Sequence, residues 1–144
     1  MKAITNLPTG EHNVSVYSLK LQCLEGQPFF SLVLVNEAGE QVNVSTKLDA
    51  FGIHQSKMLV NNLIDDFNLL LLDGKEEYNG EPLPLMPVYE FAGFEHYNMI
   101  IETLEEALKE FEAVLKINIR TKYRTANGTE SKRLEYLEMV KINA

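Results

Sequence analysis

The sequence has a single cysteine and three histidines, and both shortages exclude classes of protein. Because Cys23 stands alone, it cannot form an intrachain disulfide, and we expect it to be buried as a small hydrophobe. His12, His54 and His96 lie far apart and show none of the spacings that place two zinc ligands on one helix face. We therefore expect no metal site.

Long apolar segments are also missing. The run Leu69–Leu72 is far too short to cross a bilayer, and Met1–Gly10 has neither a basic leader nor an apolar run. These features predict a cytoplasmic protein, in the host cytoplasm if it is viral, without a membrane partner.

The usual signatures of catalysis are absent as well. The sequence contains no Gly-rich phosphate loop, no Gly-x-Ser-x-Gly motif and no Cys-His pair. The acidic pairs Asp65–Asp66, Glu76–Glu77 and Glu105–Glu106 have the chemistry of hydrolytic carboxylates or magnesium ligands, but solvated polar faces explain them better. We expect a non-catalytic protein with no catalytic residues and no cofactor.

The thirteen Lys and Arg residues, in contrast, are unevenly distributed. Six of them lie between Lys116 and Arg133, where Glu130 is the one acidic residue. These eighteen residues carry a net charge of +5, which leaves −13 on the rest of a chain whose total is −8. An acidic protein thus becomes positive in one segment, and an anionic partner is expected there.

The N-terminal half has the period-two pattern of β-strands. Alternation from Val14 to Cys23 slips once near Tyr17, which predicts a long strand with a bulge. Phe29–Asn36 is apolar on both faces and predicts a central strand, whereas Val42–Leu48 alternates and predicts a half-buried one.

Two amphipathic helices follow. Ser56 is the predicted N-cap of the first, which has a wide apolar stripe; the second runs from Phe94 or Tyr97 to Leu115. Between them, residues 73–93 contain three prolines and three glycines and predict an irregular excursion. The outer face of the second helix is an acid ladder formed by Glu102, Glu105, Glu106, Glu110 and Glu112.

The last forty residues predict a β-hairpin, because Asn127–Gly128 suits a type I′ turn. A two-residue turn would place Ala126 opposite Thr129 and Arg120 opposite Glu135, so that one cation would form a local ion pair. Tyr123 and Tyr136 would then face inward. The other face would carry Asn118, Arg120, Lys122, Arg124 and Arg133.

Alternating cations on one strand are spaced about 6.5 to 7 Å apart, close to the phosphate repeat of an extended single strand. The row could equally complement the acid ladder, within a monomer or across a dimer. The predicted nucleic-acid-binding residues are Arg120, Lys122, Arg124 and Arg133, with Lys132 and Tyr123 in addition. Candidate platforms for base stacking are Tyr17, Phe29, Phe30, Tyr123 and Tyr136.

The order of elements resembles an oligonucleotide-binding (OB) barrel: three meandering strands, a helix, a long connection and a closing hairpin. Leu7–His12 and Gly26–Leu34 look like the start of the OB-like single-stranded-DNA-binding proteins of bacteriophages. We therefore expect a single domain over residues 1–144, mainly β (α+β), with an OB-like barrel or sandwich of about five to seven strands and two packed helices.

What the resemblance implies is a non-catalytic, phage-encoded accessory protein that binds single-stranded nucleic acid in replication or recombination. The bacterial type of such proteins ends in an acidic tail that recruits partners, whereas this chain ends in the apolar Met139–Ala144. Tail-mediated recruitment is therefore not implied. The sequence does not distinguish DNA from RNA.

A different class of function also fits the sequence. An acidic protein-interaction module, such as a viral inhibitor or adaptor, would bind a basic partner through Glu102, Glu105 and Glu106. The apolar last strand, which ends at Ile142, also leaves room for edge pairing into a homodimer.

Overall fold

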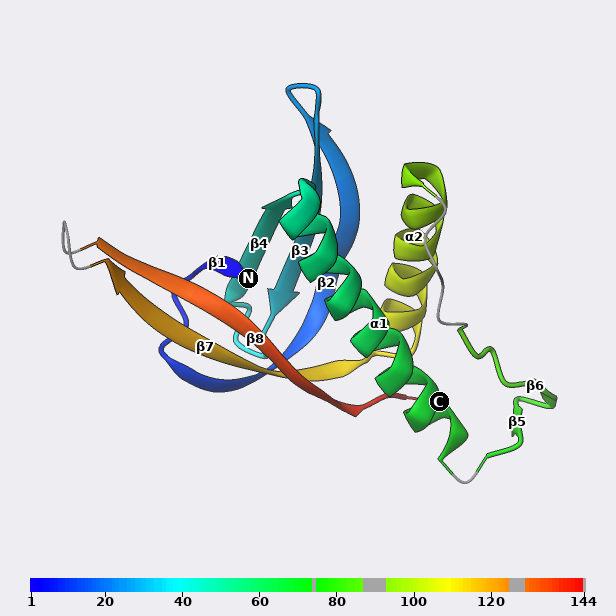
Figure 1. Ribbon diagram of the computed structural model, residues 1–144. Coiled ribbons are helices and arrows are strands. Elements are labelled where there is room, and N and C mark those ends of the chain that lie inside the picture. Colours follow the sequence, from blue (N-terminus) through cyan, green and yellow to red (C-terminus); the bar gives the residue numbers. More distant parts are fainter. Residues whose placement is uncertain (74, 87–92, 125–128, 144) are drawn as a thin grey trace.

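The computed structural model describes residues 1–73, 75–86, 93–124 and 129–143. In this part of the chain, six antiparallel strands close into a barrel and two helices pack against it (Figure 1). The predicted mainly β, OB-like fold is confirmed, and it is a barrel, not a sandwich. In chain order the elements are β1 (Lys2–Thr5), β2 (Gly10–Leu24), β3 (Gln27–Val35), β4 (Gln41–Lys47), α1 (Ala50–Leu72), β5 (Glu77–Tyr78), β6 (Glu81–Pro82), α2 (Phe94–Glu110), β7 (Val114–Arg124) and β8 (Thr129–Lys141).

The strand order around the barrel is β1-β4-β3-β2-β7-β8. The predicted meander is β2, β3 and β4, and the predicted closing hairpin is β7 and β8. The sequence did not predict β1, which lies between β4 and β8. There Ala3 pairs with Val44 on one side and with Lys132 on the other, so β1 closes the barrel.

The long strand β2 serves two partners. Its first part, Gly10 to Ser15, pairs with β7, and from Ser15 onward it pairs with β3. The register slips between Val16 and Ser18, which confirms the predicted bulge. Cys23 is exposed, so its predicted burial is wrong: the last residues of β2 extend beyond the core, where neither face is covered.

The first helix begins earlier than predicted. Asp49 is the N-cap of α1, and its Oδ1 accepts a hydrogen bond from the Gly52 backbone N–H at 2.8 Å. Ser56, the predicted N-cap, is instead fully buried inside the helix, where it donates to the carbonyl of Ile53 and accepts from the Tyr97 hydroxyl at 2.7 Å. The predicted apolar stripe of α1 is confirmed, and it faces the barrel core.

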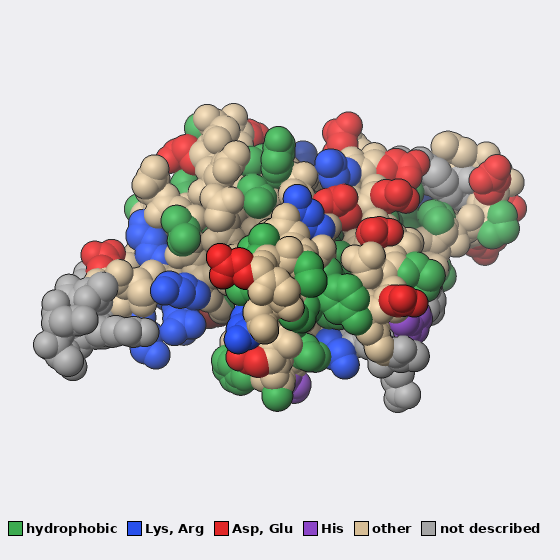
Figure 2. Space-filling model, turned by 90° about the horizontal axis from the view of Figure 1, so that it is seen from above, with side chains coloured by type: hydrophobic (Ala, Val, Ile, Leu, Met, Phe, Trp, Pro, Cys, Tyr) green, Lys and Arg blue, Asp and Glu red, His purple; other side chains and the backbone are tan. Residues whose placement is uncertain are grey.

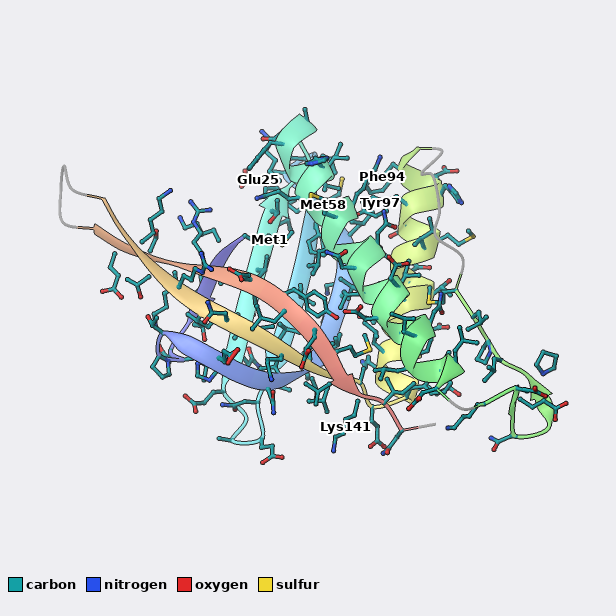
Figure 3. The ribbon with its side chains drawn as sticks, turned by 60° about the horizontal axis from the view of Figure 1, so that its bottom comes forward. Met1, Glu25, Met58, Phe94, Tyr97 and Lys141 are labelled. Carbon is teal, nitrogen blue, oxygen red and sulfur yellow. The ribbon has the colours of Figure 1, made fainter. Side chains whose placement is uncertain are left out.

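The second helix starts at Phe94 as predicted but stops at Glu110. Glu112 has a positive φ of 48°, which turns the chain, and Leu115 belongs to β7, where every second side chain enters the core. The helices run in the same direction, with Met58 and Tyr97 near their adjoining ends (Figure 3). The end of α1 and the start of α2 therefore lie at opposite ends of the helix pair (Figure 1). We call residues 75–86, the described part of the connection between them, the return segment.

A short part of this return segment is anchored to α1. The side chain of Asn68 donates to the carbonyl of Met86 and accepts from the Met86 N–H at 2.9 Å. Met86 is 6% exposed and joins the core, while β5 and β6 form a separate two-stranded ladder. The segment is thus held against the helices near its C-terminal end.

The register of the β7–β8 hairpin differs from the predicted one. Arg124 pairs with Thr129, so four residues, 125–128, connect the two strands, where two were predicted. The predicted turn residues Asn127–Gly128 lie outside the described part of the chain. The pairing is consequently shifted by two residues along β8.

From Ile117 to Arg124 the pairing differs from the predicted one by two residues, and a shift of two preserves the face of a side chain, because the side-chain period of a strand is two. Arg120 pairs with Arg133, and not with Glu135 as predicted. The predicted local ion pair still forms, diagonally, with 2.7 Å between Arg120 Nη2 and Glu135 Oε2.

Candidate nucleic-acid interface

The hairpin ends in an arm that we define as residues 120–124 of β7 and 129–133 of β8. Pairing of β7 with β2 stops at Ile119, and β1 pairs with β8 only at Lys132 and Arg133. Beyond these points the two strands pair only with each other and project from the barrel on the side opposite to α2 (Figure 1). The described backbone of the arm therefore extends away from the core.

The outer face of this hairpin brings like charges together. Lys2, Arg133 and Arg120 are successive cross-strand neighbours on β1, β8 and β7. Like charges directly opposite one another destabilise a sheet. A polyanion bound across these strands would offset that repulsion.

The cations of the hairpin's outer face are not equally available. Lys116 lies 3.5 Å from Glu138, and Arg120 is paired with Glu135 although its side chain is 64% exposed. Within the described ranges, Lys2, Lys122 and Arg133 have no salt bridge. We define the outer basic face as Lys2, Arg120, Lys122 and Arg133.

Strand β1 adds an apolar ridge to the outer basic face. Ile4 is 75% exposed and borders two shallow grooves. The groove on the β8 side, of about 430 Å³, is also lined by Lys2, Ser131 and Arg133. The groove on the β4 side, of about 370 Å³, is lined by Thr5, Asn6, Gln41 and Asn43, among others. The groove on the β8 side thus carries cations together with Glu130, and the groove on the β4 side carries amide side chains together with Glu40.

Lys132 lies on the opposite, inner face of the arm. Its Nζ donates to the carbonyls of Leu7 at 2.7 Å and Thr5 at 3.3 Å. The structure therefore does not group Lys132 with the other predicted phosphate ligands. It holds the connection between β1 and β2 against β8.

Two predicted site residues can be placed only in part. Tyr123 and Arg124 belong to β7, where they pair with Glu130 and Thr129, but their side chains lie outside the described residues.

Most of the aromatic side chains predicted to stack on bases are buried, hydrogen-bonded to another residue or distant from the hairpin. Phe30 is fully buried, and Phe29 is half-buried. The hydroxyl of Tyr136 donates to Asp66 Oδ2 at 2.5 Å, which ties β8 to α1. Tyr17 is 60% exposed, but it lies at the bulge of β2 and not on the hairpin.

Some side chains of the acid ladder accept hydrogen bonds within the chain, and others do not. Glu102 accepts from Asn98, and Glu105 is half-buried and accepts from the Leu19 N–H at 2.7 Å. Glu105 therefore does not point fully outward as predicted; it satisfies a β2 backbone group. In the described part of the chain, Glu106 is exposed and has no hydrogen-bond or salt-bridge partner.

The two signs of charge gather at opposite ends of the molecule. Lys and Arg side chains cluster beside the end of the arm, whereas Asp and Glu predominate at the end that carries α2, β5 and β6 (Figure 2). The field around this protein is therefore strongly asymmetric.

Sequence reasoning missed Lys2 and Ile4, because nothing local in the first five residues shows that they form a strand between β4 and β8. No three His, Cys, Asp or Glu side chains among the described residues gather as metal ligands would, and no helix found there is long and apolar enough to cross a membrane. Comparison with known proteins gives no matching family model and no similar curated protein.

Proposed function

We propose that this protein binds single-stranded nucleic acid without catalysis, through the outer basic face, as an accessory protein of replication or recombination in a phage. The row of like charges formed by Lys2, Arg133 and Arg120 is the observation that carries the proposal. A strand's phosphates would neutralise this row and release counterions, which supplies most of the affinity in such complexes.

The geometry of the sheet supports an extended ligand. Arg120 and Lys122 are alternate residues of β7, so their side chains are spaced about 6.5 to 7 Å apart. Ile4 offers an apolar contact for a sugar or base, and the amides of Gln41 and Asn43 offer hydrogen bonds to base edges. A duplex would keep its base edges inside its grooves, so we expect the single strand to bind more tightly.

The net charge of −8 opposes approach of a polyanion from a distance. Attraction then acts only near the outer basic face, so binding is expected to be modest and strongly salt-dependent. Each phosphate contact on a single strand contributes about 0.7 to the slope of log K against log salt.

The experiment is fluorescence anisotropy of a labelled oligothymidine, of a matched oligouridine and of a duplex, at low and moderate salt. The test variant is Lys122→Ala with Arg133→Ala; the matched control is Lys75→Ala with Lys141→Ala, which removes the same charge away from the arm. We expect the test variant to bind more weakly and to lower the salt slope by about 1.4. Equal affinities for both variants, or tighter binding of duplex than of single strand, would refute the proposal.

A further inference from the structure

A second surface lies at the other end of the molecule, between α1, α2 and the return segment. It is a groove of about 330 Å³ whose apolar floor includes Phe67, Met86 and Phe111. Its rim carries the carboxylates of Glu81, Glu106 and Glu110. We refer to this surface as the acidic groove.

The rim carboxylates of α2 differ from their neighbours on the helix. Glu102 and Glu105 of α2, and Glu112 just beyond its end, each accept a hydrogen bond from another residue of the chain. Glu106 and Glu110 are both exposed, stand one helical turn apart on the same face, and have no such partner in the described ranges. Two carboxylates therefore lie close together above an apolar floor, and neither forms an ion pair with a cation of the described residues.

This combination fits one kind of side chain. Arg and Lys have long apolar stems that cover hydrophobic surface while their charged heads stay near water or carboxylates. A basic side chain entering the acidic groove would lay its stem against Pro82, Pro84 and Ala107, above the buried Phe67 and Phe111, and bring its head to Glu106 or Glu110. The occupant expected from this chemistry is a segment that presents several cations on one face.

The arm of this same chain is such a segment. It presents Arg120, Lys122 and Arg133 on one face, and it projects from the end of the molecule opposite to the acidic groove (Figures 1 and 2). An arm so placed does not reach its own acidic groove. We propose that the acidic groove receives the arm of a second copy of this chain.

Such a contact joins two different surfaces, so it is heterologous. Each copy keeps one free arm and one free groove, and successive copies add head to tail until a ring closes or a chain grows. Exposed ion pairs weaken as salt screens them, so the association depends on both protein concentration and ionic strength. The proposal does not rest on nucleic-acid binding, although the acidic groove and a nucleic acid would compete for the same arm.

The test is sedimentation velocity without nucleic acid, over about 10 to 200 µM protein, at low salt and at about 0.5 M salt. The groove variant is Glu106→Arg with Glu110→Arg. Its matched control is Glu25→Arg with Glu37→Arg, which makes the same charge change on exposed turns far from the groove. The arm variant is Lys122→Glu with Arg133→Glu. Circular dichroism establishes that all variants are folded.

At low salt we expect the sedimentation coefficient of the wild type and of the control to rise with protein concentration. At high salt it should keep the value of a monomer at all concentrations. Neither the groove variant nor the arm variant alone should show the rise. An equimolar mixture of the two should recover it, because the unchanged arm of the groove variant meets the unchanged groove of the arm variant, and the reversed arm meets the reversed groove.

Three results would overturn the proposal: no concentration dependence in the wild type at low salt, association of the groove variant equal to that of the wild type, or no recovery in the mixture. Failure here is distinguishable from failure of the proposed function, because the groove variant should still bind oligothymidine at least as tightly as its matched control.

Discussion

Lys132 and Arg133 are neighbours in the sequence, yet they lie on opposite faces of the β7–β8 hairpin. The ammonium group of Lys132 donates hydrogen bonds to two carbonyls of the β1–β2 connection, whereas Arg133 lies on the outer face beside Lys2 and Arg120. Uncharged residues show the same division between inner and outer face: the Tyr136 hydroxyl is hydrogen-bonded to Asp66 on the inner face, whereas Ile4 is exposed on the outer face. The position of a cation relative to the core, and not its charge alone, decides whether it stabilises the fold or is available to a ligand.

The largest expected effect belongs to the inner face. Lys132→Met keeps most of the apolar stem but leaves the Leu7 and Thr5 carbonyls without their charged donor. Hydrogen bonds to charged groups contribute about 1.5 to 3 kcal/mol, so we expect the free energy of unfolding to fall by about 2 kcal/mol. Urea unfolding measures this loss. Unchanged stability, or weakened oligothymidine binding by the folded variant, would contradict the assignment of Lys132 to the fold.

Lys122→Ala should show the converse behaviour. The side chain of Lys122 is exposed and has no described partner, so its truncation should leave the free energy of unfolding within about 0.5 kcal/mol. One lost phosphate contact should weaken oligothymidine binding roughly tenfold at low salt. Arg120→Ala is the sharper comparison: because Glu135 already neutralises Arg120, its loss should cost less affinity. Anisotropy titrations would show the reverse ranking if the ion pair were irrelevant.

Tyr136→Phe tests the inner face by pH. Burial, then the hydrogen bond and charge of Asp66, raises the pKa of the Tyr136 phenol above its usual 10.0, and burial likewise raises the pKa of Tyr97 to about 12. The folded state holds these protons more tightly than the unfolded chain does. Their contribution to stability is therefore complete below about pH 10 and declines as pH rises above it.

Removing the Tyr136 hydroxyl should cost about 1 kcal/mol at neutral pH and make the decline above pH 10 shallower than in the wild type. Chemical denaturation at several pH values measures both effects. Parallel pH profiles for the two proteins would show that Tyr136 ionises as freely in the fold as in the unfolded chain.

The smallest effect should follow Glu135→Gln. An exposed ion pair contributes at most about 1 kcal/mol, and usually less, so stability should barely change. Freed from its partner, Arg120 should strengthen oligothymidine binding about two- to threefold and steepen the salt dependence. Weaker binding would mean that Glu135 positions Arg120 for the ligand and does not compete with it.

Local patterns were enough to predict five of the six barrel strands, the bulge of β2 and the placement of Arg120 and Lys122 on one face of β7, because each depends on the period of the side chains. The start of α1 was misplaced because apolar periodicity begins well after the Asp49 cap. The hairpin register depended on loop length, which a favourable Asn-Gly pair does not determine alone.

The candidate site could be predicted only in part, because some of its residues are brought together by contacts between segments that are distant in the sequence. Alternation along β7 placed Arg120 and Lys122 on one face, but β1 joins β8 across 130 residues of sequence, and no local signal in Lys2–Thr5 shows that pairing. Lys132 looked like its neighbours until the carbonyls that it binds were known. Contacts between distant segments decide which charges remain available.

The most direct test of the account is an NMR titration of the ¹⁵N-labelled protein with unlabelled oligothymidine at low salt. We predict that amide signals move on β1 around Lys2 and Ile4 and on the arm around Lys122 and Arg133. Signals around Glu106 should move only as far as the oligonucleotide displaces the arm of another copy from the acidic groove, and signals of the groove should stay in place in the Glu106→Arg, Glu110→Arg variant. Shifts centred on α2, or no shifts at protein concentrations of about 0.1 mM, well above a micromolar dissociation constant, would contradict binding of single-stranded nucleic acid by the outer basic face.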